Sequence, residues 1–345
     1  MGYRIGFDIG STTIKAVVLD ENNQICYKSY ERHKAQVRQK ALDKLVELKK
    51  YTKEPFKFAI SGSGALGLSE QGELPFVQEV FASATGVSKL YPETDCAIEL
   101  GGEDAKILFF QGSVEQRMNS TCAGGTGAFI DQMATLLNMS LEEMNEASLN
   151  YHRLYPIASR CGVFAKTDIQ PLINQGVDKC DLCASIFQAV VDQTITSLAQ
   201  GRKIEGNILF LGGPLYFMSG LRNRFVETLK LSDVQVNCPD TAINFVALGT
   251  AICADQEYTY DELYKALEDL VHAPAKLTES KPLFESEEDY QKFIERHKSH
   301  DAKYADLKNY AGKAYLGIDS GSTTTKLVLL DENDAILYDS YTSNK

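Results

Sequence analysis

The sequence predicts an α/β protein with two domains of one topology, each a mixed sheet covered by helices. Three observations predict this fold class. Strand-like apolar runs alternate with longer segments of helical spacing through residues 1–256. The chain opens on two strand-like runs joined by a short turn, and this strand–turn–strand pattern recurs near residues 95–118. At 345 residues, the chain is long enough for two hydrophobic cores.

The individual elements follow from periodicity and turn signals. Short apolar or alternating runs bounded by turn residues predict strands at 3–9, 14–20, 24–30, 57–61, 95–100, 105–110, 113–118, 207–212 and 234–237. Apolar positions at three- and four-residue intervals predict helices at 35–52, 75–90, 128–138, 140–147, 168–175, 181–202, 217–230 and 241–254.

These elements divide the chain into regions. We expect residues 1–94 together with 240–256 to form the first domain and residues 95–239 to form the second. Residues 257–313 are rich in charge and interrupted by prolines, which favours a helical linker.

The last region repeats the first strands. Residues 316–341 are identical to residues 5–30 at more than half of their positions. Residues 314–345 are too few to build a domain alone, so we expect a loose or borrowed hairpin that is the truncated start of a second unit.

Composition excludes several classes of function. A net charge of −12 argues against a nucleic-acid partner, which requires a basic face. The longest apolar runs, such as 204–215, carry charges or glycines and are too short to span a bilayer. No signal peptide is visible. We therefore expect a cytoplasmic protein, without a membrane partner, that handles nucleotides or other proteins.

The turn Asp8-Ile-Gly-Ser-Thr-Thr-Ile-Lys15 joins the first two predicted strands. Gly10 permits a tight turn, and the three hydroxyl residues after it offer hydroxyl and backbone N–H groups that suit a phosphate. Asp8, at the end of a strand, is suited to a hydrated Mg²⁺ ion. A plain hairpin turn is the alternative.

Two further glycine turns follow along the chain. Glu99-Leu-Gly-Gly-Glu-Asp-Ala-Lys106 places Asp104 after two glycines that allow a ligand to approach the backbone. Phe210-Leu-Gly-Gly-Pro214 joins a strand to a helix, where a nucleotide base and sugar would fit; a structural turn is the alternative. The order of the three motifs resembles the actin, sugar kinase and heat-shock ATPase superfamily, which implies two related domains with a nucleotide in the cleft between them. No P-loop motif is present.

Two cysteines stand in unusual surroundings. Cys122 lies in a glycine-rich loop before a predicted helix, and Cys161 leads into another helix, for which Thr167 and Gln170 predict a capping box with Pro171 in the first turn. Free N–H groups at a helix start favour a thiolate. Two cysteines supply half of a four-thiolate [4Fe–4S] site, so a second unit would have to supply the other half.

The other cysteines are expected to be structural. Cys180-Asp-Leu-Cys183 has the spacing of a redox or zinc motif, but it opens a long apolar helix and no second pair follows. Buried packing is also the expectation for Cys26, Cys96, Cys238 and Cys253. The five histidines show no ligand spacing.

The phosphate turns and both cysteine blocks of residues 1–256 resemble the BadF/BadG/BcrA/BcrD ATPase family, and within it the activators of 2-hydroxyacyl-CoA dehydratases. The resemblance implies an actin-like (ribonuclease H-like) fold, ATP/ADP and Mg²⁺ as ligands, and a homodimer holding one [4Fe–4S] cluster. It implies low-potential electron transfer from ferredoxin or flavodoxin to a dehydratase-like iron–sulfur protein. The second half of the cluster site would come from another chain or from a second unit of one longer chain.

The sequence departs from the family pattern at four positions. Glu99 and Glu103 stand where the family has Asp and Gln, which leaves the water-positioning role of Glu103 open. Ala128 and Lys166 replace a frequent Arg and a frequent acid, which affects expected nucleotide contacts rather than the cluster. Asp131 matches a family position near the nucleotide, although a solvated helix acid is an equal alternative.

The expected site is therefore as follows: catalytic, Asp8, Asp104 and Glu103; cofactor-binding, Gly10, Ser11, Thr12, Thr13, Lys15, Gly101, Gly102, Asp131, Gly212, Gly213 and Pro214; metal, Cys122 and Cys161. One rival function is a small-molecule kinase, for example one acting on an amino sugar, although no acid stands out as its base. Another is a non-redox, actin- or chaperone-like ATP switch with structural cysteines.

Overall fold

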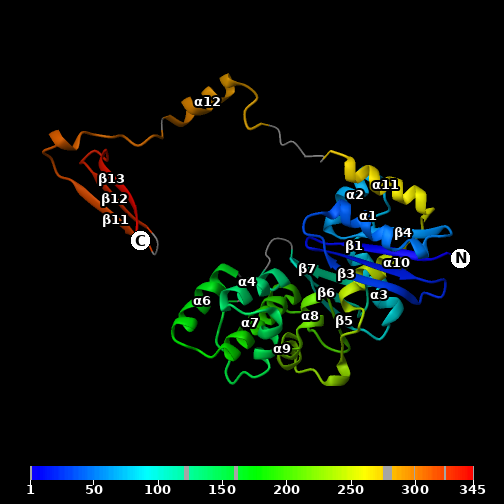
Figure 1. Cartoon of the computed structure of the whole chain (residues 1–345). Coiled ribbons are helices and arrows are strands. Elements are labelled where there is room, and N and C mark those ends of the chain that lie inside the picture. The colour runs from blue at the N-terminus through cyan, green and yellow to red at the C-terminus, as the bar shows by residue number, and fades with distance from the viewer. Residues whose placement is uncertain are drawn as a thin grey trace. The chain divides into compact units, whose positions relative to one another are not determined.

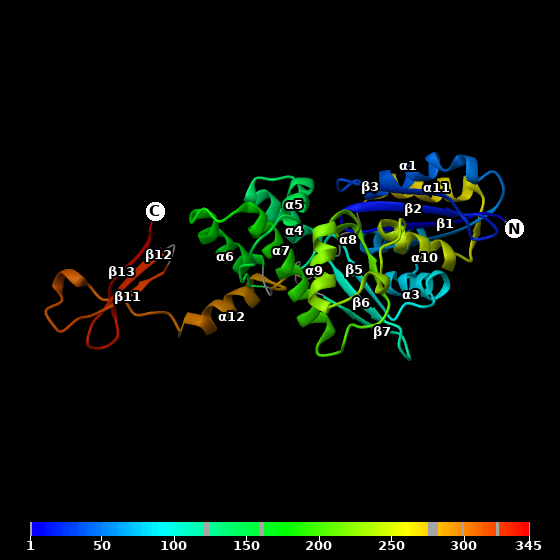
Figure 2. The same ribbon diagram turned by 90° about the horizontal axis from the view of Figure 1, so that it is seen from below.

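The computed structural model describes residues 2–119, 124–158, 162–274, 282–298, 300–321 and 324–344. The chain divides into two compact units at the boundary between Pro274 and Ala275. The first unit holds two lobes, which Figures 1 and 2 show. Each lobe is built on a five-stranded mixed sheet. The predicted α/β architecture is confirmed.

The sheet of lobe I has the strand order β10-β4-β1-β2-β3. β1 is antiparallel to β2 and parallel to β4, and β2 is antiparallel to β3. Every residue of β1 after its first is buried, as expected for a central strand covered on both faces. The strands are β1 (Arg4–Ile9), β2 (Thr13–Leu19), β3 (Ile25–Arg32), β4 (Phe56–Ser61) and β10 (Glu257–Tyr258).

Helices cover both faces of this sheet (Figure 1). α1 (Val37–Glu47), α2 (Leu66–Gly72) and α11 (Tyr260–His272) lie on one face, and α3 (Glu79–Leu90) and α10 (Phe245–Cys253) lie on the other. α2 was not predicted. α11 falls in the segment expected to be a linker, yet its apolar stripe packs in the core of lobe I, so the first compact unit continues to Pro274.

The sheet of lobe II repeats the same topology. Its order is β7-β6-β5-β8-β9, and β5 is antiparallel to β6 and parallel to β8, just as β1 relates to β2 and β4. The two sheets differ at the outer strand, because β9 is parallel to β8 whereas β10 is antiparallel to β4. The strands are β5 (Cys96–Leu100), β6 (Ala105–Phe109), β7 (Glu115–Met118), β8 (Ile208–Leu211) and β9 (Val236–Asn237).

Six helices are described in lobe II, and most of their buried residues share one core with β5, β6 and β8. The segment Lys179–Ala199 is apolar and long enough to cross a membrane by length and composition, but 67% of its most apolar window is buried inside the protein. It therefore serves as a core helix here. The helices are α4 (Gly127–Leu137), α5 (Leu141–Ser148), α6 (Gly162–Asn174), α7 (Lys179–Thr194), α8 (Gly213–Phe217) and α9 (Ser219–Leu229).

The predicted start of the helix at residue 168 is wrong. α6 begins at Gly162, so Pro171 lies inside the helix instead of in a first turn set by a capping box at Thr167. Ala165 and Ile169 are 1% and 0% exposed and belong to the core of lobe II. Burial of these side chains stabilises the turns before the proline and outweighs the local capping signal.

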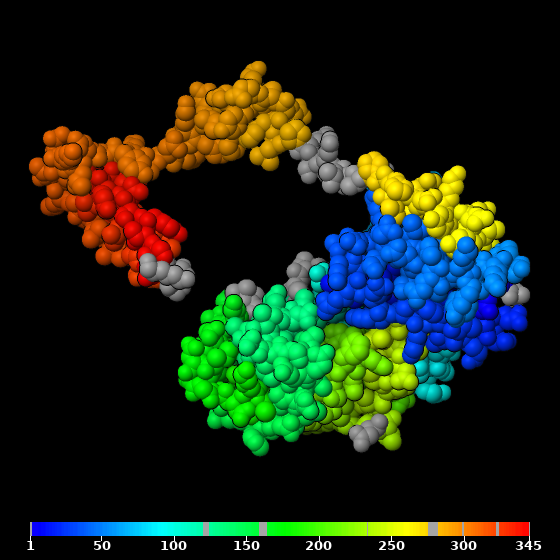
Figure 3. All heavy atoms as spheres, in the orientation of Figure 1, coloured from blue at the N-terminus to red at the C-terminus, as the bar shows by residue number. Residues whose placement is uncertain are grey.

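A third apolar cluster lies between the two sheets. It joins Val17 and Leu19 of β2 to Leu209 and Leu211 of β8, together with residues of α3 and α10. Figure 3 shows the surfaces of lobe I (blue) and lobe II (green) meeting within the first unit. The two sheets are therefore held together by packing as well as by the chain connections.

The second unit contains a helix and a three-stranded sheet of order β11-β12-β13. The sheet reproduces the register of the first hairpin, since Asp319 pairs with Lys326 just as Asp8 pairs with Lys15. Its elements are α12 (Glu287–Lys298), β11 (Tyr315–Ser320), β12 (Thr324–Leu330) and β13 (Ile336–Ser343). Among the described residues, the 3-10 turns are Lys49–Tyr51, Ser63–Ala65, Asp233–Gln235, Ala242–Asn244 and Leu307–Asn309, and Ile195–Ala199 is a π-helical segment.

Candidate nucleotide site

Two adjoining cavities of about 360 and about 750 Å³ lie between the lobes. The smaller one is lined by the first hairpin, the start of α4, the turn after β8 and the start of α10. The larger one continues past the glycine turns toward the loop after β4. Every described residue of the expected site lines one or both cavities: Asp8, Gly10, Ser11, Thr12, Thr13, Lys15, Gly101, Gly102, Glu103, Asp104, Asp131, Gly212, Gly213 and Pro214.

The first hairpin holds a partly buried ion pair next to its turn. Because Asp8 and Lys15 are partners in the β1–β2 register, Lys15 Nζ donates to Asp8 Oδ2 at 2.6 Å. Burial alone would lower the pKa of Lys15, but the charge of Asp8 and this hydrogen bond outweigh it and raise the pKa. The turn is closed by the Gly10 N–H, which donates to the Thr13 carbonyl at 2.9 Å.

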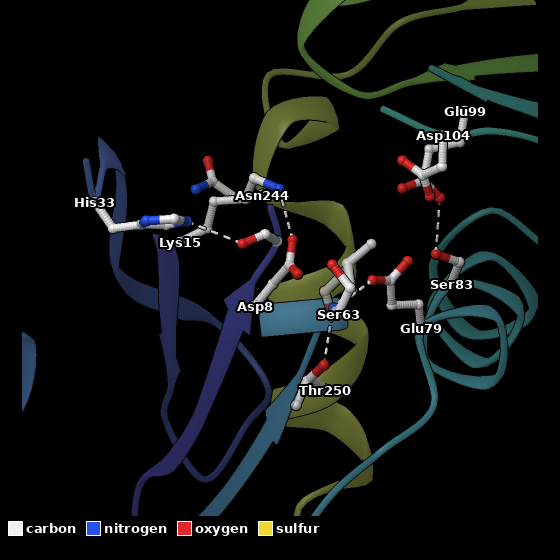
Figure 4. Close-up of polar contacts among 12 residues, drawn as sticks. Asp8, Lys15, His33, Ser63, Glu79, Ser83, Glu99, Asp104, Asn244 and Thr250 are labelled. Atoms are coloured by element: carbon white, nitrogen blue, oxygen red, sulfur yellow. Dashed lines mark hydrogen bonds and ion pairs between the residues drawn. The ribbon is translucent and has the colours of Figure 1, made fainter. Parts of the chain in front are cut away.

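His33, the residue after β3, supports this hairpin, a role that the sequence did not reveal. The Ala35 N–H donates to its Nδ1, so the ring proton is on Nε2, which donates to the Gly10 carbonyl at 3.0 Å. Its own backbone N–H donates to the Thr12 carbonyl at 3.2 Å. His33 is 3% exposed. Figure 4 shows its ring directed toward the end of the hairpin.

The glycine–acid turn of lobe II faces the hairpin. The Gly101 N–H donates to the Asp104 carbonyl at 2.8 Å. A Cβ on Gly102 would lie 3.1 Å from Thr12 Oγ1 of the opposite lobe, so glycine permits this close approach. Glu103 is exposed at the rim, whereas Asp104 is half-buried.

Lys106 is the most enclosed charged residue of this site. It is 2% exposed and its Nζ lies 2.5 Å from Glu79, 2.7 Å from Asp104 and 3.5 Å from Glu99. Burial would lower the pKa of Lys106, but the three carboxylates raise it well above its usual value. Burial raises the pKa of Glu99, with Lys106 opposing this effect and the neighbouring carboxylates adding to it.

The start of α4 is bonded to the glycine–acid turn. The Gly127 N–H donates to the Gly101 carbonyl at 2.9 Å, and the Ala128 N–H donates to the Gly102 carbonyl at 2.7 Å. We expected free N–H groups at this helix start. These two are occupied instead, and they link the turn that faces the cavities directly to the helix that follows Cys122 in the sequence.

The turn after β8 forms the other end of the smaller cavity. Gly212 has a φ of +86°, and a Cβ there would lie 2.0 Å from the Leu100 carbonyl oxygen, so this position requires glycine. Gly213 and Pro214 continue along the wall. Apolar side chains complete this end, while Asp131 supplies a carboxylate. The sequence missed these apolar wall residues, which include Phe217, Met218, Ile243 and Val246.

Cys122 and Cys161 lie outside the described residues, and their role stays a prediction. In the described part of the chain, no group of three or more His, Cys, Asp or Glu residues could hold a metal ion. Burial raises the pKa of Cys96 and of Cys183 to about 12, so both remain protonated thiols at neutral pH. Cys183 is fully buried beside Met139, which gives this cysteine a packing role, whereas Cys180 is half-buried.

Curated relatives match nearly their whole length. The 2-hydroxyisocaproyl-CoA dehydratase activator of Clostridioides difficile is 27% identical over 266 residues, which are 75% of this chain and 96% of the relative. The activator of lactoyl-CoA dehydratase of Anaerotignum propionicum is 29% identical over 258 residues, 73% and 97% of the two chains.

Solved structures agree with these relatives. Component A of the Acidaminococcus fermentans (R)-2-hydroxyglutaryl-CoA dehydratase superposes with a TM-score of 0.65 at 25% identity, covering 78% of this chain and all of that one. The Clostridium difficile activator of 2-hydroxyisocaproyl-CoA dehydratase, solved with bound ADPNP, gives a TM-score of 0.64 at 25% identity, with 80% and 100% covered. The expected actin-like fold is confirmed. The model of the BadF/BadG/BcrA/BcrD ATPase family matches residues 5–254, and the chain belongs to this family.

Proposed function

We propose that this protein is an ATP-hydrolysing activator that delivers electrons from a [4Fe–4S] cluster to a 2-hydroxyacyl-CoA dehydratase-like enzyme. Family membership and the relatives named as dehydratase activators support the activator role. The electron donor would be ferredoxin or flavodoxin. The cluster would be shared between two units, each supplying Cys122 and Cys161, either in a homodimer or within one longer chain.

One observation carries this proposal. The carbonyl groups of Gly101 and Gly102 accept the first N–H groups of α4, and α4 follows the Cys122 loop. Gly101 and Gly102 line the smaller cavity, so a nucleotide bound there would contact this turn. A shift of the turn that accompanies ATP binding would therefore move the start of α4 with it. ATP drives such a change only by its different affinity for the two arrangements.

Several residues that line the cavities would bind the nucleotide or take part in its hydrolysis. The carboxylates of Asp8 and Asp104 line the larger cavity, and oxygen ligands of this kind fit a hydrated Mg²⁺ ion that neutralises the phosphates. Lys15 orients Asp8 through the 2.6 Å ion pair. Glu103, exposed at the same cavity, would orient the attacking water. The apolar wall around Phe217 would hold the base, and Asp131 the ribose.

The proposal is tested by anaerobic purification followed by iron, sulfide and ATPase assays. We expect four iron and four sulfide per pair of units, ATP hydrolysis, and ATP-dependent reduction of a dehydratase by reduced ferredoxin. Cys122→Ser and Cys161→Ser should lose the iron, while Cys180→Ser, a half-buried cysteine elsewhere in lobe II, should keep it. Asp104→Asn should keep the iron and lose most of the ATPase activity.

Two results would contradict the proposal. Unchanged iron content in both Cys122→Ser and Cys161→Ser would exclude the cluster ligands. A colourless protein that phosphorylates an amino sugar would favour a kinase instead. The mass of the iron-loaded protein in solution decides whether the second pair of cysteines comes from another chain.

A further inference from the structure

Glu79, the first residue of α3, bridges the two lobes. Its Oε1 accepts a hydrogen bond from the Ser63 N–H, in the loop after β4, at 3.1 Å. Its Oε2 accepts from Lys106 Nζ, on β6 of lobe II, at 2.5 Å. Figure 4 shows Ser63 and Glu79 directed toward each other, with Glu99 and Asp104 beyond them. One carboxylate therefore contacts both sides of the larger cavity.

Lys106 is the junction of this bridge. Besides Glu79, it contacts Asp104 Oδ2 at 2.7 Å and Glu99 Oε1 at 3.5 Å. Ser83 Oγ donates to the other oxygen of Glu99 at 3.1 Å, which fixes that carboxylate from α3. A buried cation is stable only when it is paired, and three carboxylates around one ammonium group leave each of them dependent on it. Removing the cation would free Asp104 to turn.

We propose that Lys106 is a positioning residue that orients Asp104 at the glycine–acid turn of lobe II. Through Glu79, Lys106 also ties this turn to the Gly62–Ser63 loop of lobe I. The inference rests on the proposed nucleotide site, because Lys106 would orient Asp104 toward a Mg²⁺-nucleotide bound in the cavities. The turn is then held at two points. Lys106 ties it to lobe I, and the bonds of Gly101 and Gly102 tie it to α4.

The two partners of the bridge should have different kinetic effects. Lys106→Met releases Asp104, so the Mg²⁺ concentration for half-maximal ATPase activity should rise at least tenfold and kcat should fall at least tenfold. Glu79→Gln leaves Lys106 on Asp104 but weakens the tie between the lobes. A smaller fraction of molecules is then competent to bind, so KM for MgATP should rise at least threefold with kcat within twofold of wild type.

The double variant tests whether both residues act through one bridge. Its KM and Mg²⁺ requirement should equal those of Lys106→Met alone, because without Lys106 the Glu79 carboxylate no longer ties the turn to lobe I. Glu31→Gln is the matched control, since Glu31 also pairs with lysines, Lys40 and Lys44, but does not line either cavity. Glu31→Gln should leave kcat, KM for MgATP and the Mg²⁺ requirement within twofold of wild type.

Loss of folding is separated from loss of positioning by a second substitution. Lys106→Arg keeps the buried charge but changes the donor geometry, and it should still raise the Mg²⁺ requirement at least threefold at an unchanged thermal midpoint. Additive effects in the double variant, or a wild-type Mg²⁺ requirement in the folded Lys106 variants, would overturn the inference. Wild-type protein that neither binds nor hydrolyses ATP would instead overturn the proposed nucleotide site.

Discussion

At the residue scale, His33 shows how a side chain outside every motif supports the phosphate hairpin. Its ring spans from the Ala35 N–H to the Gly10 carbonyl, and its backbone bonds to Thr12. Both hydrogen bonds to the hairpin are made to carbonyls of the turn that faces the larger cavity. The imidazole therefore fixes the direction in which the turn presents its N–H and hydroxyl groups.

His33→Ala should loosen this turn. The Gly10 carbonyl would lose its partner in a part-buried position, which costs about 1 kcal/mol of folding stability. KM for MgATP should rise several-fold because the turn must be ordered on binding. Thermal unfolding and ATPase kinetics measure the two effects. His33→Gln, whose amide nitrogen can reach the position of Nε2, should recover part of both.

A control removes a histidine without this role. His300→Ala changes an exposed residue of the second unit and should alter neither stability nor KM. Equal KM values for His33→Ala and wild type would show that the ring does not hold the turn in the state that binds nucleotide.

Local spacing in the sequence predicted the site residues that lie on turns next to strands, and these residues line the cavities. Asp8 is an example, because a carboxylate, a glycine and hydroxyls within a few residues are visible in the sequence. The sequence did not reveal the roles of His33, Glu79 and Lys106, and there is a physical reason for this. Glu79 and Lys106 are 27 positions apart and meet only because α3 packs between the sheets. No period in the sequence encodes that contact.

At the element scale, α11 shows why the sequence placed the start of the linker earlier than the packing does. Its many charged residues are typical of a solvated linker helix, but its three leucines recur at helical intervals. These leucines, Leu263, Leu267 and Leu270, are 0%, 1% and 3% exposed in the core of lobe I. The helix also contacts α1 and α2 on the outer face of the first sheet. Charge content alone does not separate a linker helix from an amphipathic covering helix.

Leu267→Ala should therefore destabilise the first unit. Truncating a buried leucine removes apolar contacts and leaves a cavity, at a cost of about 2–5 kcal/mol. Chemical denaturation of the full chain measures this loss. Leu283→Ala is the matched control, since Leu283 is 87% exposed and the same truncation there should cost less than about 0.5 kcal/mol.

Truncated chains extend the same test. A chain ending at Pro274 should unfold like the first unit of the full protein, whereas a chain ending at residue 256 should lose stability because it lacks α11 and the two residues of β10. Equal stability of the two chains would show that α11 is a linker helix and does not stabilise lobe I.

The start of α6 shows a second limit of local signals. Thr167 and Gln170 satisfy the capping pattern, and Pro171 is normally tolerated only in a first turn. The helix nevertheless begins at Gly162, because Ala165 and Ile169 bury their side chains in the core of lobe II. Periodicity predicted that a helix exists here, but tertiary packing decides where it starts.

At the scale of the whole molecule, one sequence motif occurs in two environments. Ile5 and Phe7 of β1 are 0% exposed, whereas the matching residues of β11, Leu316 and Ile318, are 60% and 63% exposed. Strand pairing is the same in both copies, and Lys326 contacts Asp319 at 2.7 Å as Lys15 contacts Asp8 at 2.6 Å. Local sequence therefore determines the hairpin, and the surrounding helices determine whether its apolar face is buried.

This difference predicts a specific surface property of the second unit. Leu316 and Ile318 lie on one face of β11, since alternate residues of a strand point the same way. Exposed apolar strands of this kind favour association. Leu316→Lys combined with Ile318→Lys should lower the binding of an apolar fluorescent dye and the concentration-dependent light scattering of the full chain. ATPase activity should stay unchanged, because all residues lining both cavities belong to the first unit. Leu283→Lys adds one of the two positive charges away from the sheet and should leave dye binding unchanged. Unaltered dye binding in the double variant would mean that this face is covered in solution.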